Sequence, residues 1–249
     1  MFSLHAFSGS IATSSAFTNL AAVPDPTITT SGNLLYVGAL QNLLGAYFFG
    51  GAILRGQITS PSLLNITPLD VAPVDVSVLP STNPPIFLQE GAPYKLIETE
   101  ALQAFATTSA NEQESALIWL GDGAIAPISG EIVHARATAT SGSTGYVWSN
   151  ASLSFETQLP AGSYNIVGVR AEGANLIAIR LVFQGSASFR PGVIGVGSAH
   201  AIEPLNGLFR NGKFGSFGSF NQFNPPSIDI INNGTSETIV LYLDLIKTG

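Results

Sequence analysis

Short runs of alternating apolar and polar residues follow one another through the second half of the chain. In one of them Leu153 and Phe155 face one way while Ser154 and Glu156 face the other, which is the period of a half-buried β-strand. Turn-forming residues separate the runs, such as Gly121-Asp122-Gly123 and Asn232-Asn233-Gly234. The pattern predicts strands within 116–120, 131–139, 151–159, 164–171, 175–183, 227–231 and 238–246. Strands of this number and spacing indicate an antiparallel β sandwich or barrel over residues 111–249.

Residues 33–110 have a different texture. Apolar residues recur near helical spacing after Asn33, a candidate N-cap, and predict a helix that weakens at Gly50-Gly51. Dense prolines follow, which exclude long helices and central strands, so 74–78 and 86–88 are interpreted as edge strands or straps packing on the sandwich. Residues 97–110 are expected to form a second short helix.

Residues 1–32 are small and mostly uncharged, with Asp25 as the single charge. Pro24 and Pro26 stiffen the end of this stretch. The interpretation is an extended N-terminal arm. Together the three regions predict a mainly β protein, with an antiparallel β sandwich, an extended arm and one or two short helices.

Charge is scarce along the whole chain. Only 10% of residues are charged, against about a quarter in an ordinary soluble domain, while 45% are hydrophobic. A surface with so few charges favours burial against neighbouring molecules. The net charge of −7 and the scattered arginines weigh against nucleic-acid binding, which needs clustered cations. The apolar stretch Leu43–Leu54 is better explained as a helix buried in protein than as a membrane span, and membrane contact is left open.

Few residues suggest reaction chemistry. The chain has no cysteine, so thiolate nucleophiles and Cys-based metal sites are excluded. His134 lies in a predicted strand and His200 in a predicted loop, and one imidazole in either place does not make a transition-metal site. No nucleophile elbow is present. A glycosidase-like pair among Glu131, Glu156 and Glu172 stays open, because such carboxylates are paired in space. We expect no catalytic residue, metal or cofactor.

A phenylalanine repeat is the most unusual local feature. Rings recur every three residues among Gly, Ser, Asn and Gln near Arg210 and Lys213. The rings could stack bases, pack on the sandwich or anchor a contact between subunits, and the last reading is favoured because aromatic residues are enriched at interface hot spots. The candidate interface residues are Phe209, Phe214, Phe217, Phe220 and Phe223.

A second aromatic pair suggests an alternative. Tyr146 and Trp148 are two positions apart, so in an extended segment both rings lie on one face. Planar rings of this kind are needed by a carbohydrate-binding β sandwich, for which these two residues are the candidate glycan-binding site. Packing in the core is the competing explanation for both.

The strand run at 115–247, the uncharged arm, the Arg190-Pro191-Gly192 break and the Gly/Ser/Thr/Asn-rich texture resemble viral jelly-roll coat proteins. The resemblance implies a jelly-roll sandwich and a structural capsid subunit in the virion. It also implies a chain that assembles through arm and loop contacts with copies of itself and other virion proteins, without catalysis. One departure is that residues 1–32 lack the basic side chains with which many coats bind their genome. The alternatives are an extracellular or cell-surface carbohydrate-binding module or a fibre component.

Overall fold

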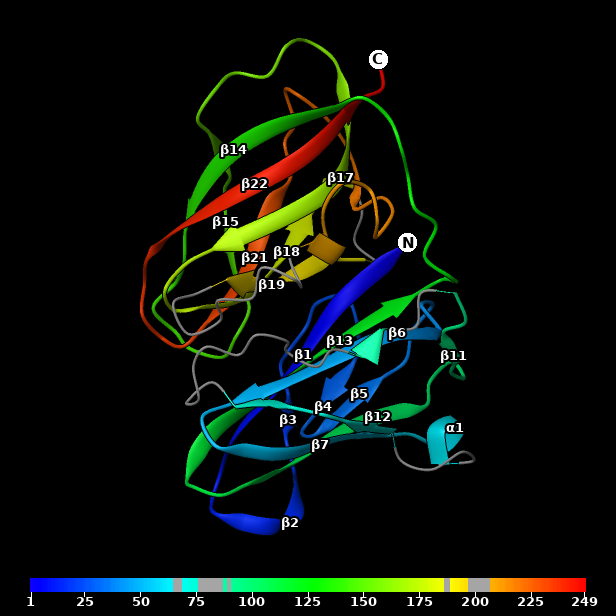
Figure 1. The fold of residues 1–249 in the computed structure, drawn as a ribbon, viewed down its shortest axis with the longest axis vertical. Helices are drawn as coiled ribbons and strands as arrows, with labels where there is room; N and C mark the ends of the chain where they lie inside the picture. Colours follow the sequence, from blue (N-terminus) through cyan, green and yellow to red (C-terminus); the bar gives the residue numbers. More distant parts are fainter. Residues whose placement is uncertain (65–68, 76–86, 89–90, 186–188, 197–206) are drawn as a thin grey trace. The chain divides into compact units, whose positions relative to one another are not determined.

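The computed structural model describes residues 1–64, 69–75, 87–88, 91–185, 189–196 and 207–249. Strands dominate, and apart from the helix α1 (Pro61–Leu64) and a helical turn at 207–208 the described residues contain no helix. The predicted mainly β sandwich class is therefore confirmed. The chain divides into two compact units, residues 2–124 and residues 125–249 together with Met1, and each is described separately (Figure 1).

The unit formed by residues 2–124 contains two sheets. The first has the order β10-β6-β13-β1-β3, with β9 and β11 also on β6, and the second has the order β4-β5-β12-β7-β8, with β2 on β12. The strands are β1 (Phe2–Ile11), β2 (Ser14–Asn19), β3 (Ala21–Ala22), β4 (Thr30–Ser31), β5 (Leu34–Tyr36), β6 (Asn42–Gly50), β7 (Ile53–Thr59), β8 (Leu69–Val71), β9 (Val74–Asp75), β10 (Phe87–Leu88), β11 (Tyr94–Lys95), β12 (Ala101–Thr108) and β13 (Glu112–Gly121).

The core of this unit lies where alternate residues of the two sheets meet. Ala116, Ile118 and Leu120 of β13 contribute one side, and Leu102 and Ala104 of β12 contribute the other. All five side chains are fully or almost fully buried. The alternation of β12 therefore removes one apolar face of that strand from water, whereas β13 is buried on both faces from Glu114 to Gly121.

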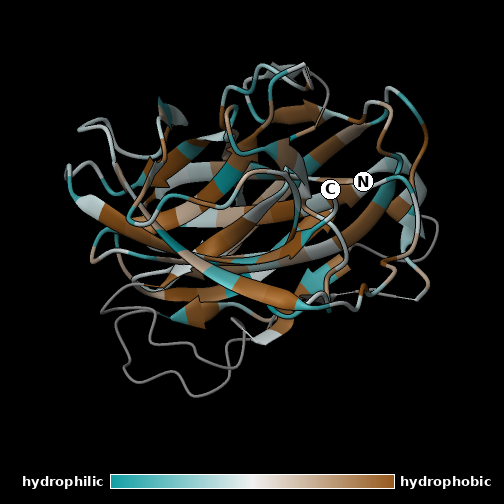
Figure 2. Cartoon of the chain, turned by 90° about the horizontal axis from the view of Figure 1, so that it is seen from above, coloured by the Kyte–Doolittle hydropathy of each residue, from teal (hydrophilic) through white to brown (hydrophobic). Residues whose placement is uncertain are grey.

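The unit formed by residues 125–249 is built on a ladder of order β15-β21-β18-β19-β17-β22-β14-β16, with β20 on β17. A short parallel pair, Ala171 with Gly195 and Glu172 with Val196, joins β17 to β19, while the other pairs in this unit are antiparallel. In Figure 2 the brown (hydrophobic) stretches lie largely on the strands. The strands are β14 (Ile132–Thr140), β15 (Ser149–Ala151), β16 (Ser154–Phe155), β17 (Ser163–Glu172), β18 (Leu176–Val182), β19 (Gly192–Val196), β20 (Gly218–Asn221), β21 (Ser227–Asn232) and β22 (Thr238–Lys247).

Six of the seven strands expected in the second half are present, as β13, β14, β17, β18, β21 and β22. The strand expected at 151–159 is wrong over most of its length, because only Ala151 in β15 and Ser154–Phe155 in β16 are strand residues. One assignment changes its place in the fold, because β13 pairs along its length with β1 and β6 and so belongs to the first unit. Residues 87–88 form β10 as expected, whereas most of 74–78 lies outside the described residues beyond β9.

The helix expected after Asn33 is wrong. Residues 42–50 form β6 and residues 53–59 form β7. From Leu43 to Gly50 every residue of β6 is buried, so the strand needs apolar side chains on both faces and shows no alternation. A continuous apolar run of this kind does not distinguish helix from strand. No described helix has the length and hydropathy needed to span a membrane.

Two further segments differ from expectation. The short helix expected at 97–110 is instead the strand β12, whose alternating burial places Leu102, Ala104 and Ala106 in the core. The expected arm at 1–32 begins with β1, which lies between β13 and β3 and pairs with β13 from Phe2–Gly121 to Ile11–Glu112. In Phe2–Ile11 the lack of charge therefore reflects burial in a sheet, whereas β2 is largely exposed.

Candidate interaction surface

Four of the five candidate interface phenylalanines lie in the interior of the second unit. Phe209, Phe214, Phe217 and Phe220 are between 1% and 6% exposed. The rings of Phe209 and Phe214 have centroids 4.9 Å apart. For these four residues the structure supports packing in the core, and a spacing of three residues does not place the rings on one exposed face.

Backbone hydrogen bonds hold the phenylalanine segment against β17. The Val169 N–H donates to the Phe209 carbonyl at 2.8 Å, and the Phe217 N–H donates to the Ile166 carbonyl at the same distance. Between them the Gly212 N–H donates to the Val167 carbonyl at 2.7 Å. Gly212 has a φ of 71°, a conformation that glycine adopts without steric cost.

Hydrogen bonds to the Asp244 carboxylate on β22 hold the same segment. Arg210 donates to its carboxylate through Nε at 2.7 Å and Nη2 at 2.5 Å, and the Asn211 N–H donates at 2.8 Å. His134 Nδ1 lies 2.9 Å from the carboxylate. Burial alone would raise the pKa of Asp244, but the bonds from Arg210 and Asn211 outweigh burial and hold that pKa below its ordinary value.

Gly168 explains how β17 makes room for this carboxylate. A Cβ at Gly168 would overlap the side chain of Asp244, with which it is paired in the sheet. The register of β17 against β22 shifts between Ile166 and Gly168. The bulge and the missing side chain together allow a fully buried charge inside the sheet.

Phe223 is the exception in the phenylalanine segment, because its side chain is 77% exposed. It lines a hollow of about 190 Å³ together with Phe155, Gln158, Leu159 and Gln222. An exposed ring at a concave and uncharged place is typical of an interaction surface.

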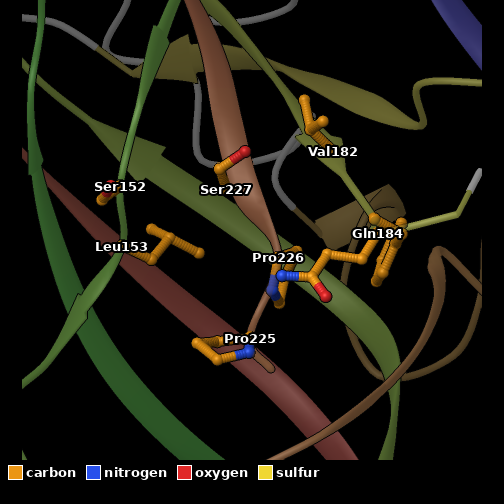
Figure 3. A pocket seen from close by; sticks show the side chains of 8 residues that line it. Ser152, Leu153, Val182, Gln184, Pro225, Pro226 and Ser227 are labelled. Carbon is orange, nitrogen blue, oxygen red and sulfur yellow. The ribbon is translucent and has the colours of Figure 1, made fainter. Parts of the chain in front are cut away.

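A second hollow of about 280 Å³ lies between residues 152–153, 182–184 and 225–227. Figure 3 shows Leu153 on one side of it and Pro225, Pro226 and Gln184 on the other. Ser152, Val182, Phe183 and Ser227 complete the lining, which contains no charged side chain. We call the two hollows and Phe223 the Phe223 surface.

The candidate glycan residues do not form an open pair of rings. The guanidinium of Arg180 lies 4.1 Å from the centroid of the Trp148 ring, so one face of that ring is covered. Arg180 is fully buried, and its Nε donates to Asp229 at 2.9 Å. Tyr146 is half-buried at a turn, with a φ of 60°.

The other residues considered for chemistry lie in ion pairs, at the exposed surface or outside the described residues. Glu156 pairs with Arg136, and Glu172 pairs with Arg170 at 2.6 Å. Glu131 is exposed and His200 is not among the described residues. Among the described side chains no group of three or more His, Cys, Asp or Glu is arranged to hold a metal ion.

Sequence reasoning missed several buried carboxylates, three of which are nearly or fully inaccessible. Asp25 lies 2.8 Å from His5, with its side chain 1% exposed, and Asp244 and Glu114 are fully buried. For Asp244 a signal existed, since it is the one charge inside the apolar run Thr238–Ile246. Nothing in the local sequence around Glu114 distinguishes it from the exposed Glu112.

Comparisons with known proteins identify no family. No family model matches the chain, and no curated protein matches it. A search of solved structures finds a likeness to the major capsid protein P2 from Bacteriophage PM2, with 10% sequence identity over 99% of this chain and 97% of that chain. The TM-score is 0.27, so this likeness carries no weight in the argument below.

Proposed function

We propose that this chain is a structural, self-assembling subunit, a viral capsid protein located in the virion, whose partners are copies of itself and other virion proteins. The observation that carries the proposal is the shortage of charge at its surface. Subunits of a closed shell exchange solvated surface for contact area, because hydrophobic burial across many contacts holds the assembly together.

The fold makes this shortage more severe than the composition alone indicates. The chain has nine Lys plus Arg and sixteen Asp plus Glu, and among the described residues the side chains of Asp25, Glu100, Glu114, Arg180, Asp229 and Asp244 are buried. The exposed surface is left with still fewer charges, while large apolar side chains such as Phe223 and Ile97 are more than half exposed. Such a surface favours contact with other protein over isolation in water.

The Phe223 surface is the part of the chain that fits a subunit contact. A protruding ring beside an uncharged hollow has the chemistry of an interface anchor, which loses water when a partner covers it. Two copies that each carry a net charge of −7 repel one another, so a contact between them is least costly where the surface is neutral.

We expect the purified full-length protein to form particles larger than a monomer, measured by light scattering and negative-stain microscopy of one fraction. The Phe223→Ser variant should need at least about tenfold more protein for half assembly, since truncating a hot-spot anchor costs about 2 kcal/mol or more. Ile97→Ser is the matched control, because Ile97 is 65% exposed in the other unit. A monomer at all concentrations and salt conditions would contradict self-assembly. If both variants raise the protein concentration for half assembly equally, the role of Phe223 in the contact is contradicted, but self-assembly is not.

One observation favours a second function, the binding of a neutral carbohydrate. The smaller hollow places the rings of Phe155 and Phe223 beside the amides of Gln158 and Gln222. Apolar ring faces next to uncharged hydrogen-bonding groups suit a sugar better than a charged ligand. A glycan array and ligand-observed NMR on the wild type test this. Binding that is lost in Phe223→Ser and kept in Ile97→Ser would support it, and an empty array would contradict it.

A further inference from the structure

Glu114 is buried at the end of the first unit where the chain changes sheets. Residues 50–53 pass from β6 in one sheet to β7 in the other, and residues 108–112 pass from β12 back to β13. The two passages are tied together, because the Ser109 N–H and the Thr108 hydroxyl donate to the Ala52 carbonyl at 3.0 and 3.1 Å. We call this region the crossing end.

The carboxyl of Glu114 fills the space beneath the first passage. The residue is 0% exposed, and within the described part of the chain neither carboxyl oxygen has a hydrogen-bond partner. It lies so close to Gly50 that a Cβ on that glycine would overlap Glu114 Oε2. At Gly51 an added Cβ would lie 3.1 Å from the carboxyl carbon of Glu112. The Gly50-Gly51 pair therefore leaves room for two acidic side chains.

Among the described residues, the charged groups that act on Glu114 are of its own sign. Glu112 on the same strand and Asp75 on β9 act on it electrostatically, and the glycines of the β6–β7 turn bring no charge. Arg55 of β7 pairs at 3.2 Å with Asp70 in an exposed position and is not among the groups that act on Glu114. Burial first, and then Glu112 and Asp75, raise the pKa of Glu114 to about 7. The Thr108 hydroxyl lowers it only in part, because that hydroxyl donates to the Ala52 and Ala110 carbonyls and not to the carboxyl.

We propose that the Glu114 carboxyl is a proton-controlled latch at the crossing end: protonated, it lets the Gly50–Ala52 turn close over it, and ionised, it drives that turn open. A neutral carboxyl tolerates an apolar surrounding, whereas a buried carboxylate beside two others requires water. The latch goes beyond the proposed assembly function and does not depend on it.

The direction with pH follows from the proton count. In the open form Glu114 meets water and has its ordinary pKa of 4.5, so between pH 4.5 and 7 the closed form binds more protons than the open form. Closing therefore becomes less favourable as the pH rises through this window. Above pH 7 the effect is complete.

The Ser109 amide, whose partner is the Ala52 carbonyl, reports opening directly. We expect its protection against hydrogen exchange, corrected for the intrinsic rate, to fall on the order of fiftyfold between pH 5 and pH 8. In Glu114→Gln, which mimics the protonated form, the protection should stay nearly constant. Glu112→Gln is the matched control. Its Ser109 protection should still fall as the pH rises, but the midpoint of that fall should lie at lower pH than in the wild type. The Val169 amide in the other unit should show no such fall.

Protection at Ser109 that does not change with pH in the wild type, or an equal fall in Glu114→Gln, would overturn the latch. A second measurement needs no variant. Carbon-13 NMR of the Glu114 carboxyl in the wild-type chain should give a midpoint near 7. A midpoint near the ordinary value of 4.5 would also overturn the proposal, because a latch that is already ionised below pH 6 cannot hold the turn closed.

Discussion

Replacing Asp244 with Asn is expected to destabilise the protein by about 3–5 kcal/mol at pH 7, the usual cost of removing one partner from a buried ion pair. The carboxylate accepts from Arg210, from the Asn211 N–H and from His134, and it is fully buried. An amide cannot satisfy these donors, because its nitrogen is itself a donor. Urea unfolding monitored by fluorescence measures the loss.

The effect of this substitution should depend on pH. The folded state holds the pKa of Asp244 below its ordinary value of 3.8, so the unfolded state binds more protons as the pH falls. The stabilisation by the carboxylate is present above the ordinary pKa and is lost as the pH falls through the folded pKa. The gap between wild type and Asp244→Asn should therefore narrow from pH 7 to pH 3. If the difference in the free energy of unfolding between wild type and Asp244→Asn does not change with pH, the charge of Asp244 is not responsible for the stabilisation.

Asp70 offers the matched control for charge removal. It also pairs with an arginine, Arg55, but both side chains of that pair are 59% exposed. Surface ion pairs contribute about 0–1 kcal/mol, so Asp70→Asn should change the free energy of unfolding by less than about 1 kcal/mol. Comparable losses from the two substitutions would contradict the importance of burial at Asp244.

The second large effect is expected at Gly212. A Cβ there would overlap the carbonyl oxygen of Ile128, and the φ of 71° is unfavourable for any residue with a side chain. Ala at this position must separate two backbone segments and break the bonds from Gly212 to Val167 and from Ile128 to Gly212. Strain of about 1–2 kcal/mol and two lost hydrogen bonds of about 1 kcal/mol each predict a loss of about 3 kcal/mol. Thermal or urea unfolding measures it.

Substitution of Gly185 separates the cost of the positive φ from the cost of the clash with Ile128. Its φ is 78°, but apart from its chain neighbours no atom of the described residues lies within 4 Å of a Cβ built there. Gly185→Ala should therefore show the conformational cost alone, about 1 kcal/mol. If both alanine variants lose the same free energy, the contact with Ile128 plays no part. A loss that is much larger at Gly212 supports the close backbone approach.

The strands of the second half were predictable because their signal is local. In β22 the buried side chains alternate from Ile239 to Leu243, so one face of the strand can be read from a few residues. The same method failed in β6, where both faces are buried and the apolar run carries no period. It failed in β1 for a related reason, since a small uncharged segment can be a flexible arm or an inner strand.

The candidate residues show the same division. A spacing of three residues in the phenylalanine segment gives no information on which ring is exposed, and the structure leaves only Phe223 of the five in water. Trp148 was a reasonable candidate for an open ring face until the fold placed Arg180 against it. Both outcomes depend on residues that are distant in sequence, so no local pattern contains them.

By itself, the sequence determined that the protein is mainly β, poor in charge and without cysteine, because alternation and composition are properties of neighbouring residues. Only the tertiary structure decided which strands pair, as when Phe2 meets Gly121, and which carboxylates are buried. It also decided that Gly50 lies against Glu114 and that Asp244 receives Arg210. These contacts join residues tens of positions apart, and their energies depend on burial, which a linear pattern does not record.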